Sequence, residues 1–497
     1  MPPLTRAESS GYTETSLHAD VLAFLAALDH PHLSRGTFGA SPEGRELPLL
    51  VLSAKGVRTP DEARAAGLPV VLVINGIHAG EVEGKEASLM LVRDLLAGRH
   101  AGLLEKLTLV VVPLFNPDGN DRIDPKNRAL DVAHFSGQLG PAKGVGTRVN
   151  ASGVNLNRDY LRHESAEMRQ LHRGVYLAWS PDLTIDCHAT NGSVHRFHLT
   201  YDTPHTIESG RPEPIRFMRE QFCPELTRRV RAGSGRETFF YGNFVEDEGG
   251  QGEGWMTYTH HPRFGSNYRG LTGRCDLLFE CYSYISFEER VKTTYQLLEE
   301  ALQIAAERGD DLRRVVAEAQ TPRERVAVRY GLEAEAAPAR VLTRSPRTLE
   351  GAPVEVVIPH LARFVGTAVV DRPWAYAVTE DVGRHLARHG LAVHQLSVPV
   401  EAAVEAPVIE EVRETDSRSI LEAPGELRLV ARLERRTQTL PAGTWLVETA
   451  QPLGAVAVYL CEAESDDGLV AAGLLTKPAP GDKYPALRVL EPLRVGA

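Results

Sequence analysis

The sequence is poor in cysteine. It has only five in 497 residues, an odd number, and none are in C-x-x-C spacing. A disulfide framework needs paired and regularly spaced cysteines, so we expect reduced, mostly buried thiols. Apolar runs long enough to cross a membrane are missing, and the N-terminal stretch has no apolar core of signal-peptide length. These absences favour a cytoplasmic location without a membrane partner.

An excess of basic charge is also absent. The formal net charge is −11, and the arginines are interspersed with acidic residues, so no basic stripe forms. This balance argues against a nucleic-acid partner. Hydrophobic content of 42% and charged content of 24% are ordinary for a globular protein. A chain of 497 residues exceeds a usual single core, so we expect two domains.

The predicted organisation of the chain starts from residues 69–86, PVVLVINGIHAGEVEGKE. Five aliphatic residues ending at Asn75-Gly76 predict a strand buried on both faces. His78 and Glu81 follow in a loop of small residues, and a helical pattern begins at Glu83. Open α/β sheets carry their chemistry where a strand opens into such a loop. A His and a Glu three apart there can bind one metal ion, although the spacing alone also occurs by chance.

Further runs complete the predicted fold. Strands are expected at residues 49–53, 107–115, 182–187 and 277–280, and helices at residues 16–28 and 287–306. Residues 122–153 have little periodicity and predict a long functional loop. Strands separated by helical patterns predict an α/β three-layer sandwich with a central mixed, largely parallel sheet flanked by helices.

The character of the chain changes after about residue 321. Short β-type runs occur at residues 354–358, 367–370, 427–433, 445–448 and 455–460, and residues 372–395 have room for one helix. We therefore predict a domain at residues 1–335 and a smaller β-rich domain of unknown role at residues 336–497. Beyond Arg340 the sequence suggests no ligand-like cluster, and the Glu-rich residues 401–414 read as a solvated face.

A mononuclear zinc site needs a third protein ligand beside His78 and Glu81. The candidates are His163, His172, His188, His195, His198, His260 and His261. His188 is best placed because it ends an apolar strand. Asp186 shares its face two residues earlier and is a candidate partner for the imidazole. Each of these histidines also has a plain structural interpretation.

Two further groups would complete a hydrolytic site. Glu280 ends the apolar run Leu277-Leu278-Phe279 and is a candidate general base; an ion pair with Arg274 or Arg290 is the structural alternative. Arg148 and the pair Asn157-Arg158 suit recognition of a carboxylate or an oxyanion, although solvated surface arginines are common.

In this order, the residues resemble the zinc carboxypeptidase superfamily of the carboxypeptidase A type, the funnelins. The matching motifs are HAGE at 78–81, NPDG at 116–119, Arg148 with Asn157-Arg158, D-x-H at 186–188 and FE at 279–280. Each motif is weak by itself, but the ordered set is specific and spans most of residues 15–310. The tract at residues 239–284, with QPLG at 451–454 and ESDDGL at 464–469, resembles a bacterial branch with a C-terminal extension.

The resemblance implies one Zn²⁺ held by His78, Glu81 and His188. It implies that Glu280 takes a proton from the zinc-bound water and delivers it to the leaving amine. Arg148 would polarise the scissile carbonyl, and Asn157 and Arg158 would hold the substrate's terminal carboxylate.

The sequence departs from the family in two places. Asn155 stands where a carboxylate commonly orients the first His ligand, although an amide oxygen can still accept the imidazole proton. The family's mobile substrate-capping tyrosine has two candidates, Tyr258 and Tyr268.

Three functions follow. The leading one is a zinc metallocarboxypeptidase that acts on a peptide or small amide with a free carboxylate. The second is a zinc amidohydrolase of the same fold, acting on a small N-acyl amino acid or a cell-wall peptide; the third is a non-catalytic binding module. Arg269, Thr272 and Arg274 are candidates to line a side-chain pocket for an acidic or polar residue.

Overall fold

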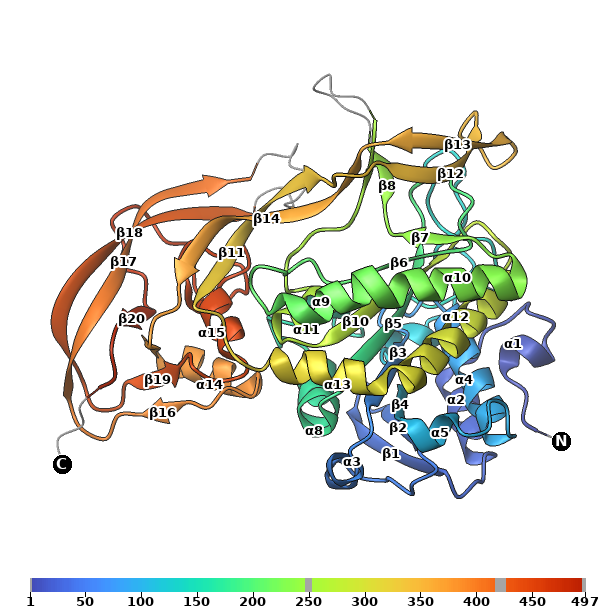
Figure 1. Ribbon diagram of the computed structural model, residues 1–497, viewed down its shortest axis with the longest axis horizontal. Helices are drawn as coiled ribbons and strands as arrows, with labels where there is room; N and C mark the ends of the chain where they lie inside the picture. The colour runs from blue at the N-terminus through green and yellow to red at the C-terminus, as the bar shows by residue number, and fades with distance from the viewer. Residues whose placement is uncertain (1, 246–252, 416–425, 494–497) are drawn as a thin grey trace.

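The computed structural model describes residues 2–245, 253–415 and 426–493 (Figure 1). Its largest sheet has eight strands in the order β1-β2-β4-β3-β5-β10-β6-β7. The central strands β4, β3, β5 and β10 are parallel, and so are β6 and β7. The pairs β1–β2, β2–β4 and β10–β6 are antiparallel. The strands are β1 Leu33–Ala40, β2 Glu46–Leu52, β3 Val70–Asn75, β4 Thr108–Val112, β5 Leu183–Thr190, β6 Leu199–Asp202, β7 Thr238–Phe240 and β10 Cys275–Tyr282.

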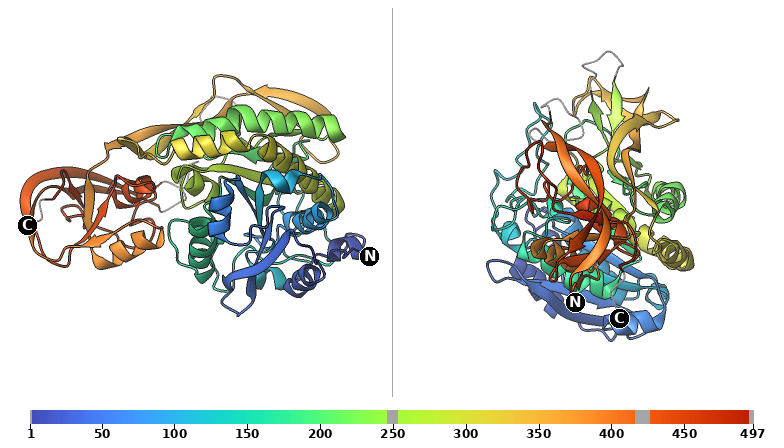
Figure 2. Two further views of the ribbon diagram at one scale, coloured as in Figure 1. Left: turned by 60° about the horizontal axis from the view of Figure 1, so that its bottom comes forward. Right: turned by 90° about the vertical axis from the view of Figure 1, so that its left-hand side faces the viewer.

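Both faces of this sheet are covered, as β3 illustrates. Side chains alternate along a strand. Val71 and Val73 therefore pack into one core, against α4, α10 and α12, while Leu72 and Ile74 pack into a second core on the other face. Figure 1 shows α10 and α12 in front of the central strands, and Figure 2 (left) shows them as a layer along one side of the sheet. The predicted three-layer sandwich is confirmed.

The helices of the first layer are longer than those of the second. On the first face lie α4 Glu83–Leu96, α10 Cys223–Ser234 and α12 Phe287–Glu307; on the second lie α7 Ala166–Leu171, η2 His172–Tyr176, α8 Leu177–Trp179 and α11 Gly265–Leu271. The other elements of this part are α1 Arg6–Ser9, α2 His18–Ala26, α3 Pro60–Ala66, α5 Leu103–Lys106, α6 Pro117–Asp121, η1 Leu156–Arg158, α9 Pro212–Phe217, η3 Met218–Phe222, β8 Asn243–Val245, β9 Gly254–Met256 and α13 Gly309–Glu318. Residues 122–153 hold turns and isolated bridges without a helix or strand, as predicted.

Three further sheets include the strands that follow residue 324. A four-stranded sheet has the order β11-β14-β9-β8, β12 and β13 form a hairpin, and a six-stranded sheet has the order β16-β19-β15-β20-β17-β18. The bounds are β11 Arg325–Ala334, β12 Ala339–Ser345, β13 Ala352–Ile358, β14 His360–Asp371, β15 Ala375–Val378, α14 Glu380–Arg388, β16 His394–Gln395, β17 Val400–Glu414, β18 Leu427–Leu440, β19 Trp445–Glu448, α15 Gly454–Cys461 and β20 Leu487–Val489. The predicted β-rich character of this part is confirmed (Figure 2).

Contacts cross the predicted boundary after residue 335. β14 pairs with β9, and the Thr343 hydroxyl donates to the Val194 carbonyl oxygen at 2.6 Å. The division into residues 1–335 and 336–497 stays a prediction.

One expected strand is wrong. Residues 455–460 belong to α15, and every residue of that helix is buried. An all-apolar run has no periodicity that separates a buried strand from a buried helix. The five cysteines are free and buried, as predicted. Within the described ranges, the helices are too short or too polar to cross a bilayer. The cytoplasmic location stays a prediction.

Candidate metal centre and substrate cavity

Three side chains from two strand ends converge at one edge of the large sheet. The Nδ1 atoms of His78 and His188 are 3.2 Å apart, and they lie 3.2 and 2.9 Å from Oε2 of Glu81. Ligand atoms arranged tetrahedrally about 2.0–2.1 Å from zinc lie about 3.3 Å from one another. The nitrogen and oxygen donors therefore fit a zinc ion in both chemistry and spacing. Of the seven candidate histidines, His188 completes this group.

Local backbone geometry brings the two loop ligands together. β3 ends at Asn75, and Gly76 takes a φ of +67°, which favours glycine. The Glu81 N–H donates to the His78 carbonyl oxygen at 2.9 Å and closes a backbone turn. The side chains of His78 and Glu81 meet on the same side of this turn. A Cβ on Gly80 would lie 2.7 Å from Cδ of Arg128, so glycine there lets Arg128 approach the ligands.

The outer nitrogen of each histidine has a fixed neighbour. Nε2 of His78 lies 3.1 Å from Oδ1 of Asn155, so the amide takes the place expected of a carboxylate. Nε2 of His188 lies 3.1 Å from Oδ1 of Asp186, the partner expected from the sequence. Arg269 in turn donates to Oδ2 of Asp186 at 2.9 Å. Such neighbours hold the imidazoles with Nδ1 facing the site.

The charge of the site is set by burial and by two arginines. Burial raises the pKa of Glu81, but His78, Arg128 and His188 outweigh it and hold that pKa well below the usual range. Arg128 donates to Oε1 of Glu81 at 3.0 Å, and Arg148 does so at 3.2 Å. Oε1 of Glu81 therefore faces both arginines, while Oε2 faces His188, and Nδ1 of His78 lies 3.2 Å from each oxygen. Burial lowers the pKa of His78 to about 4, which favours the neutral imidazole that binds metal.

Glu280 lies beside these residues on the neighbouring strand. In the parallel β5–β10 pair it is in register with His188. Burial raises its pKa to about 8, with His188 acting against the shift and Glu81 adding to it. The alternative ion pairs are not formed, because Arg274 donates to Ser180 and Arg290 to backbone oxygens such as that of Leu139. Glu280 is thus directed to the cavity.

A cavity of about 320 Å³ opens over the proposed ligands His78 and Glu81. Its lining includes His78, Glu81, Arg128, Arg148, Asn157, Arg158, Tyr241, Tyr258, Phe264, Ser266, Leu278 and Glu280. The predicted substrate-binding residues Asn157 and Arg158 and the predicted Arg148 thus share one space with the metal ligands. Asn157 is fixed there because its Oδ1 accepts the N–H of Gly265 at 2.9 Å.

Arg158 is a partly buried cation in this lining. Its guanidinium lies 3.5 Å from the centroid of the Phe264 ring, and one nitrogen donates to the Asn157 carbonyl oxygen at 2.7 Å. Burial, together with the positive charges of Arg148 and Arg263, lowers its pKa to about 9. Among the described residues, no carboxylate forms an ion pair with it. An anion entering the cavity would supply the missing counter-charge.

The two tyrosine candidates lie in different places, and only Tyr258 lines the cavity. Tyr258 lines the cavity and donates to the Thr203 carbonyl oxygen at 3.2 Å. Tyr268 is buried on α11 and its hydroxyl lies 2.8 Å from Nδ1 of His389, outside this lining. The sequence offered Tyr268 as a residue that caps the substrate, but the structure places it outside the cavity. The reason is that the glycine-flanked segment forms the helix α11 rather than a loop.

The expected specificity residues are also elsewhere. Arg269, Thr272 and Arg274 line a different cavity of about 310 Å³ on the α11 side of the sheet. Arg269 is held by Asp186 and Asp276, and so it supports the metal centre from behind. The turn from β9 into α11 therefore presents Phe264 and Ser266, not these three residues, to the substrate cavity.

Sequence reasoning missed Arg128, Tyr241 and Phe264. Arg128 lies in the aperiodic loop, where its φ of +51° aims the side chain at Glu81. No motif or periodicity marks such a residue, because a long loop is placed only by tertiary contacts. Phe264 could have been suspected from the aromatic residues flanking the glycine-rich approach to β10.

Comparisons with known proteins bear on this geometry. Residues 21–176 match the zinc carboxypeptidase family. Carboxypeptidase 2 of Trichophyton tonsurans is similar along nearly the whole chain, with 24% identity over 90% of this chain and 81% of that protein. The chain is thus similar to zinc carboxypeptidases, and the match to the family itself covers residues 21–176. Carboxypeptidase D of Mus musculus is 31% identical over 30% of this chain and 11% of its own length.

Solved structures of carboxypeptidases are also similar, over a smaller share of this chain. A metallo-carboxypeptidase from Burkholderia cenocepacia has a TM-score of 0.41 and 18% identity, over 58% of this chain and 68% of that chain. A metallo-carboxypeptidase from Pseudomonas aeruginosa, in complex with (2-guanidinoethylmercapto)succinic acid, has a TM-score of 0.39 and 19% identity, over 60% and 69%. These similarities support a metallopeptidase, that is, a hydrolase.

Proposed function

We propose that this metallopeptidase removes the C-terminal residue of peptides, with zinc held by His78, Glu81 and His188. One observation carries the proposal: Arg158 is a partly buried cation without an ion-pair partner among the described residues, in the same cavity as the metal donors His78 and Glu81. A buried guanidinium is costly unless a bound anion compensates it. The free α-carboxylate of a peptide is the anion that fits this place.

Substrate recognition then follows from the lining of the cavity. Arg158 offers a planar fork of N–H donors to the terminal carboxylate, and stacking on Phe264 fixes its plane. Asn157 is held by Gly265 so that its amide stays beside that guanidinium. Only the last residue of a chain carries a free carboxylate. Recognition of that group therefore makes the enzyme an exopeptidase. Tyr258 would contact the bound residue from the same lining.

The proposed catalytic steps are assigned to residues that flank the metal ligands. When bound, zinc supplies a Lewis acid for the scissile carbonyl and the attacking water. Glu280 accepts a proton from that water at its carboxylate and passes it to the leaving nitrogen. Its raised pKa suits both halves of this transfer, and a bound cation would lower that pKa toward neutrality. Arg148 faces the ligand Glu81 and would donate to the developing oxyanion.

We also propose that residues 1–335 are the catalytic domain and residues 336–497 a β-rich domain of unknown role. The proposal is supported by the separate six-stranded sheet of the C-terminal part. Every side chain assigned a catalytic, ligand or substrate-binding role above comes from the first part.

The test compares matched peptides with free and amidated C-termini, alongside N-acetyl amino acids. We expect the free peptide to be cleaved at least about 10- to 100-fold better, because amidation removes a charge-assisted contact worth about 1.5–3 kcal/mol. Equal cleavage of the two peptides would rule the proposal out. Preference for the N-acetyl amino acids would instead support the zinc amidohydrolase.

A further inference from the structure

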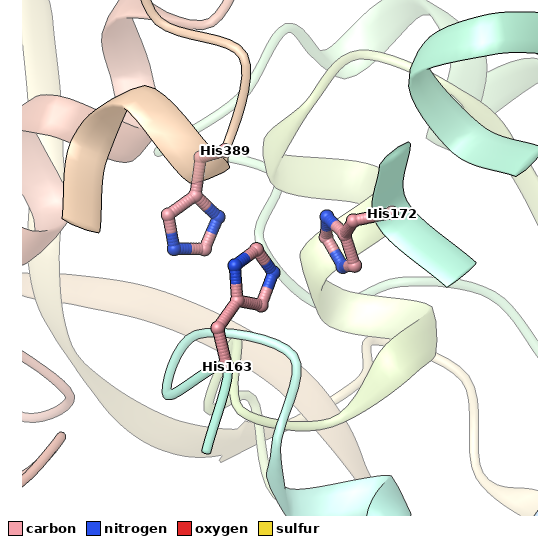
Figure 3. Close-up of side chains that lie close together, drawn as sticks. All are labelled: His163, His172 and His389. Carbon is pink, nitrogen blue, oxygen red and sulfur yellow. The ribbon is translucent and has the colours of Figure 1, made fainter. Parts of the chain in front are cut away.

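A second group of histidines lies away from the catalytic centre. His163, His172, His385 and His389, here the histidine cluster, join residues far apart in the chain. In Figure 3, His163 lies between His172 and His389. We propose that this cluster binds one divalent transition-metal ion of the zinc type, which would connect the C-terminal part of the chain to the catalytic part.

The cluster is assembled from three segments. His172 begins η2, His385 and His389 lie in and just after α14, and His163 lies in the loop after η1. All four side chains are at most 1% exposed. Ligand nitrogens of His163, His172 and His389 lie within 4.8 Å of one another. No sequence pattern beyond Arg340 predicts a ligand, because α14 is brought to His163 only by the fold.

The nitrogens of the cluster are poorly satisfied. Neither ring nitrogen of His163 has a hydrogen-bond partner among the described residues, and the same is true of Nε2 of His172 and Nδ1 of His385. An imidazole nitrogen buried without a partner costs free energy. A metal ion would use these lone pairs, and it would explain why four polar rings are gathered in a closed place.

The rings are also in the protonation state that binds metal. Burial lowers the pKa of His163, His172 and His389 well below the usual range, and neighbouring histidines add to the shift. Burial lowers the pKa of His385 to about 4. Neutral imidazole is the ligand form, so an ion binds here without displacing protons. Of the nearby cations, Arg169 and Arg388 are exposed and so are screened by solvent. The third, Arg269, is buried, and its charge is balanced by the ion pairs with Asp186 and Asp276.

Binding requires one ring to turn. His163 and His389 are stacked, with ring centroids 4.0 Å apart and planes at 19°, so their in-plane lone pairs do not meet. The terminal torsion of a histidine is broad. A turn of His163 about this bond would point one of its free nitrogens at the neighbouring rings. His163 also has a φ of +50°, a conformation that costs a non-glycine residue free energy and is found at functional sites.

The protein already holds the outer positions of the cluster. The Tyr268 hydroxyl lies 2.8 Å from Nδ1 of His389. Nε2 of His385 donates to the Leu161 carbonyl oxygen at 2.9 Å. The Tyr268 contact orients the His389 ring from outside, as partners of metal-bound histidines do. The Leu161 carbonyl oxygen also lies 3.3 Å from Nε2 of His389, so a bound ion would replace this second, longer contact. Tyr268, a candidate to contact the substrate in the sequence analysis, thus contacts His389 of the histidine cluster instead.

A third group, His260, His261 and Asp466, differs in this respect. Nε2 of His260 lies 2.7 Å from Asp466, and Nδ1 of His261 lies 2.5 Å from the Thr259 hydroxyl. Each of its rings has one protein partner and one free nitrogen, whereas both ring nitrogens of His163 are free, and two of its members are adjacent in the chain. We make no metal assignment there.

An all-imidazole set selects zinc, copper, nickel or cobalt over magnesium and calcium, which prefer oxygen. The test therefore uses Co²⁺ as a visible probe. Chelator-stripped wild-type protein and the double variant His78→Gln/His188→Gln are titrated with Co²⁺, and bound metal is measured by equilibrium dialysis and by visible absorption. We expect two equivalents in the wild type and one in the double variant, which lacks the catalytic donors.

Adding His163→Gln or His389→Gln to the double variant should abolish the remaining equivalent. His394→Gln is the matched control, because that histidine is on β16 of the same part and its side chain is 59% exposed. Zn²⁺ should also raise the melting temperature of the double variant, and this shift should vanish with His163→Gln. If the double variant binds no Co²⁺, the cluster is a neutral packing device and the proposal fails. This readout needs no folded His163 variant and no catalytic activity.

Discussion

Glu280 on β10 stands in register with His188 on β5, one strand apart in a parallel pair. Glu280 is therefore a carboxylate of raised pKa that lies next to a proposed metal ligand and is not itself a proposed ligand. Side chains in register on neighbouring strands share a face of the sheet. The same edge also receives His78 and Glu81 from the loop after β3. Glu280 and His188 are therefore set on rigid strands, whereas His78 and Glu81 lie in a loop.

Glu280→Gln should lower kcat by about 10²- to 10⁴-fold, because the amide cannot accept the proton of the attacking water. The three metal donors are untouched, so the bound metal should stay at the wild-type level. Peptide hydrolysis and metal content are measured on the same preparation. A variant that hydrolyses as fast as the wild type would show that Glu280 is not the base.

Arg128→Ala should weaken metal binding about 10- to 100-fold, because Arg128 holds the distal oxygen of Glu81. Competition with a chromophoric chelator gives the affinity. Arg122→Ala is the control: Arg122 is in the same loop but pairs with the exposed Glu43. Equal affinities of the two variants would remove Arg128 from the metal centre.

Asn155→Asp should tighten metal binding, and Asn155→Ala should weaken it about 10- to 100-fold. The reason is that Oδ1 of Asn155 faces Nε2 of His78, and a carboxylate would make that imidazole a more basic ligand. Both variants are measured in the same chelator competition. No difference between Asp and Ala at this position would mean that Asn155 does not act through His78.

Arg158→Gln should lower kcat/KM for free-carboxylate peptides by about 10- to 100-fold, mostly through KM, because a charge-assisted contact of about 1.5–3 kcal/mol is lost. Slow cleavage of an amidated peptide should hardly change. Steady-state kinetics on the matched pair measures both effects. A similar loss on both peptides would point to a general structural role of Arg158.

Asp466→Asn should destabilise the fold by about 3 kcal/mol near neutral pH, because Asp466 is buried against His260. Burial raises the pKa of Asp466, but His260 outweighs it and holds that pKa below the usual range. A carboxyl with a lowered folded pKa stabilises above its unfolded pKa of about 3.9 and loses that contribution as the pH falls further. The difference between wild type and variant in denaturant unfolding should therefore be full at pH 6 and shrink below about pH 4. Asp61→Asn, at a 91% exposed side chain, is the control.

The sequence by itself determined the strands and the site at their ends. Aliphatic runs followed by turn residues marked β3, β4, β5 and β10, because a strand buried on both faces needs little beyond its own composition. Motif order then singled out His78, Glu81, His188 and Glu280. These side chains sit at fixed offsets from those strands, so a local pattern was enough to bring them together.

Only the tertiary structure decided what depends on contacts between distant segments. It brought Arg128 to Glu81, set Tyr268 against His389 instead of the substrate, and folded residues 455–460 into α15. It also joined His163 and His172 to α14, more than 200 residues further along the chain. Loops and buried apolar runs carry no periodicity that specifies a partner. Their positions follow from packing, which acts between residues that the sequence keeps far apart.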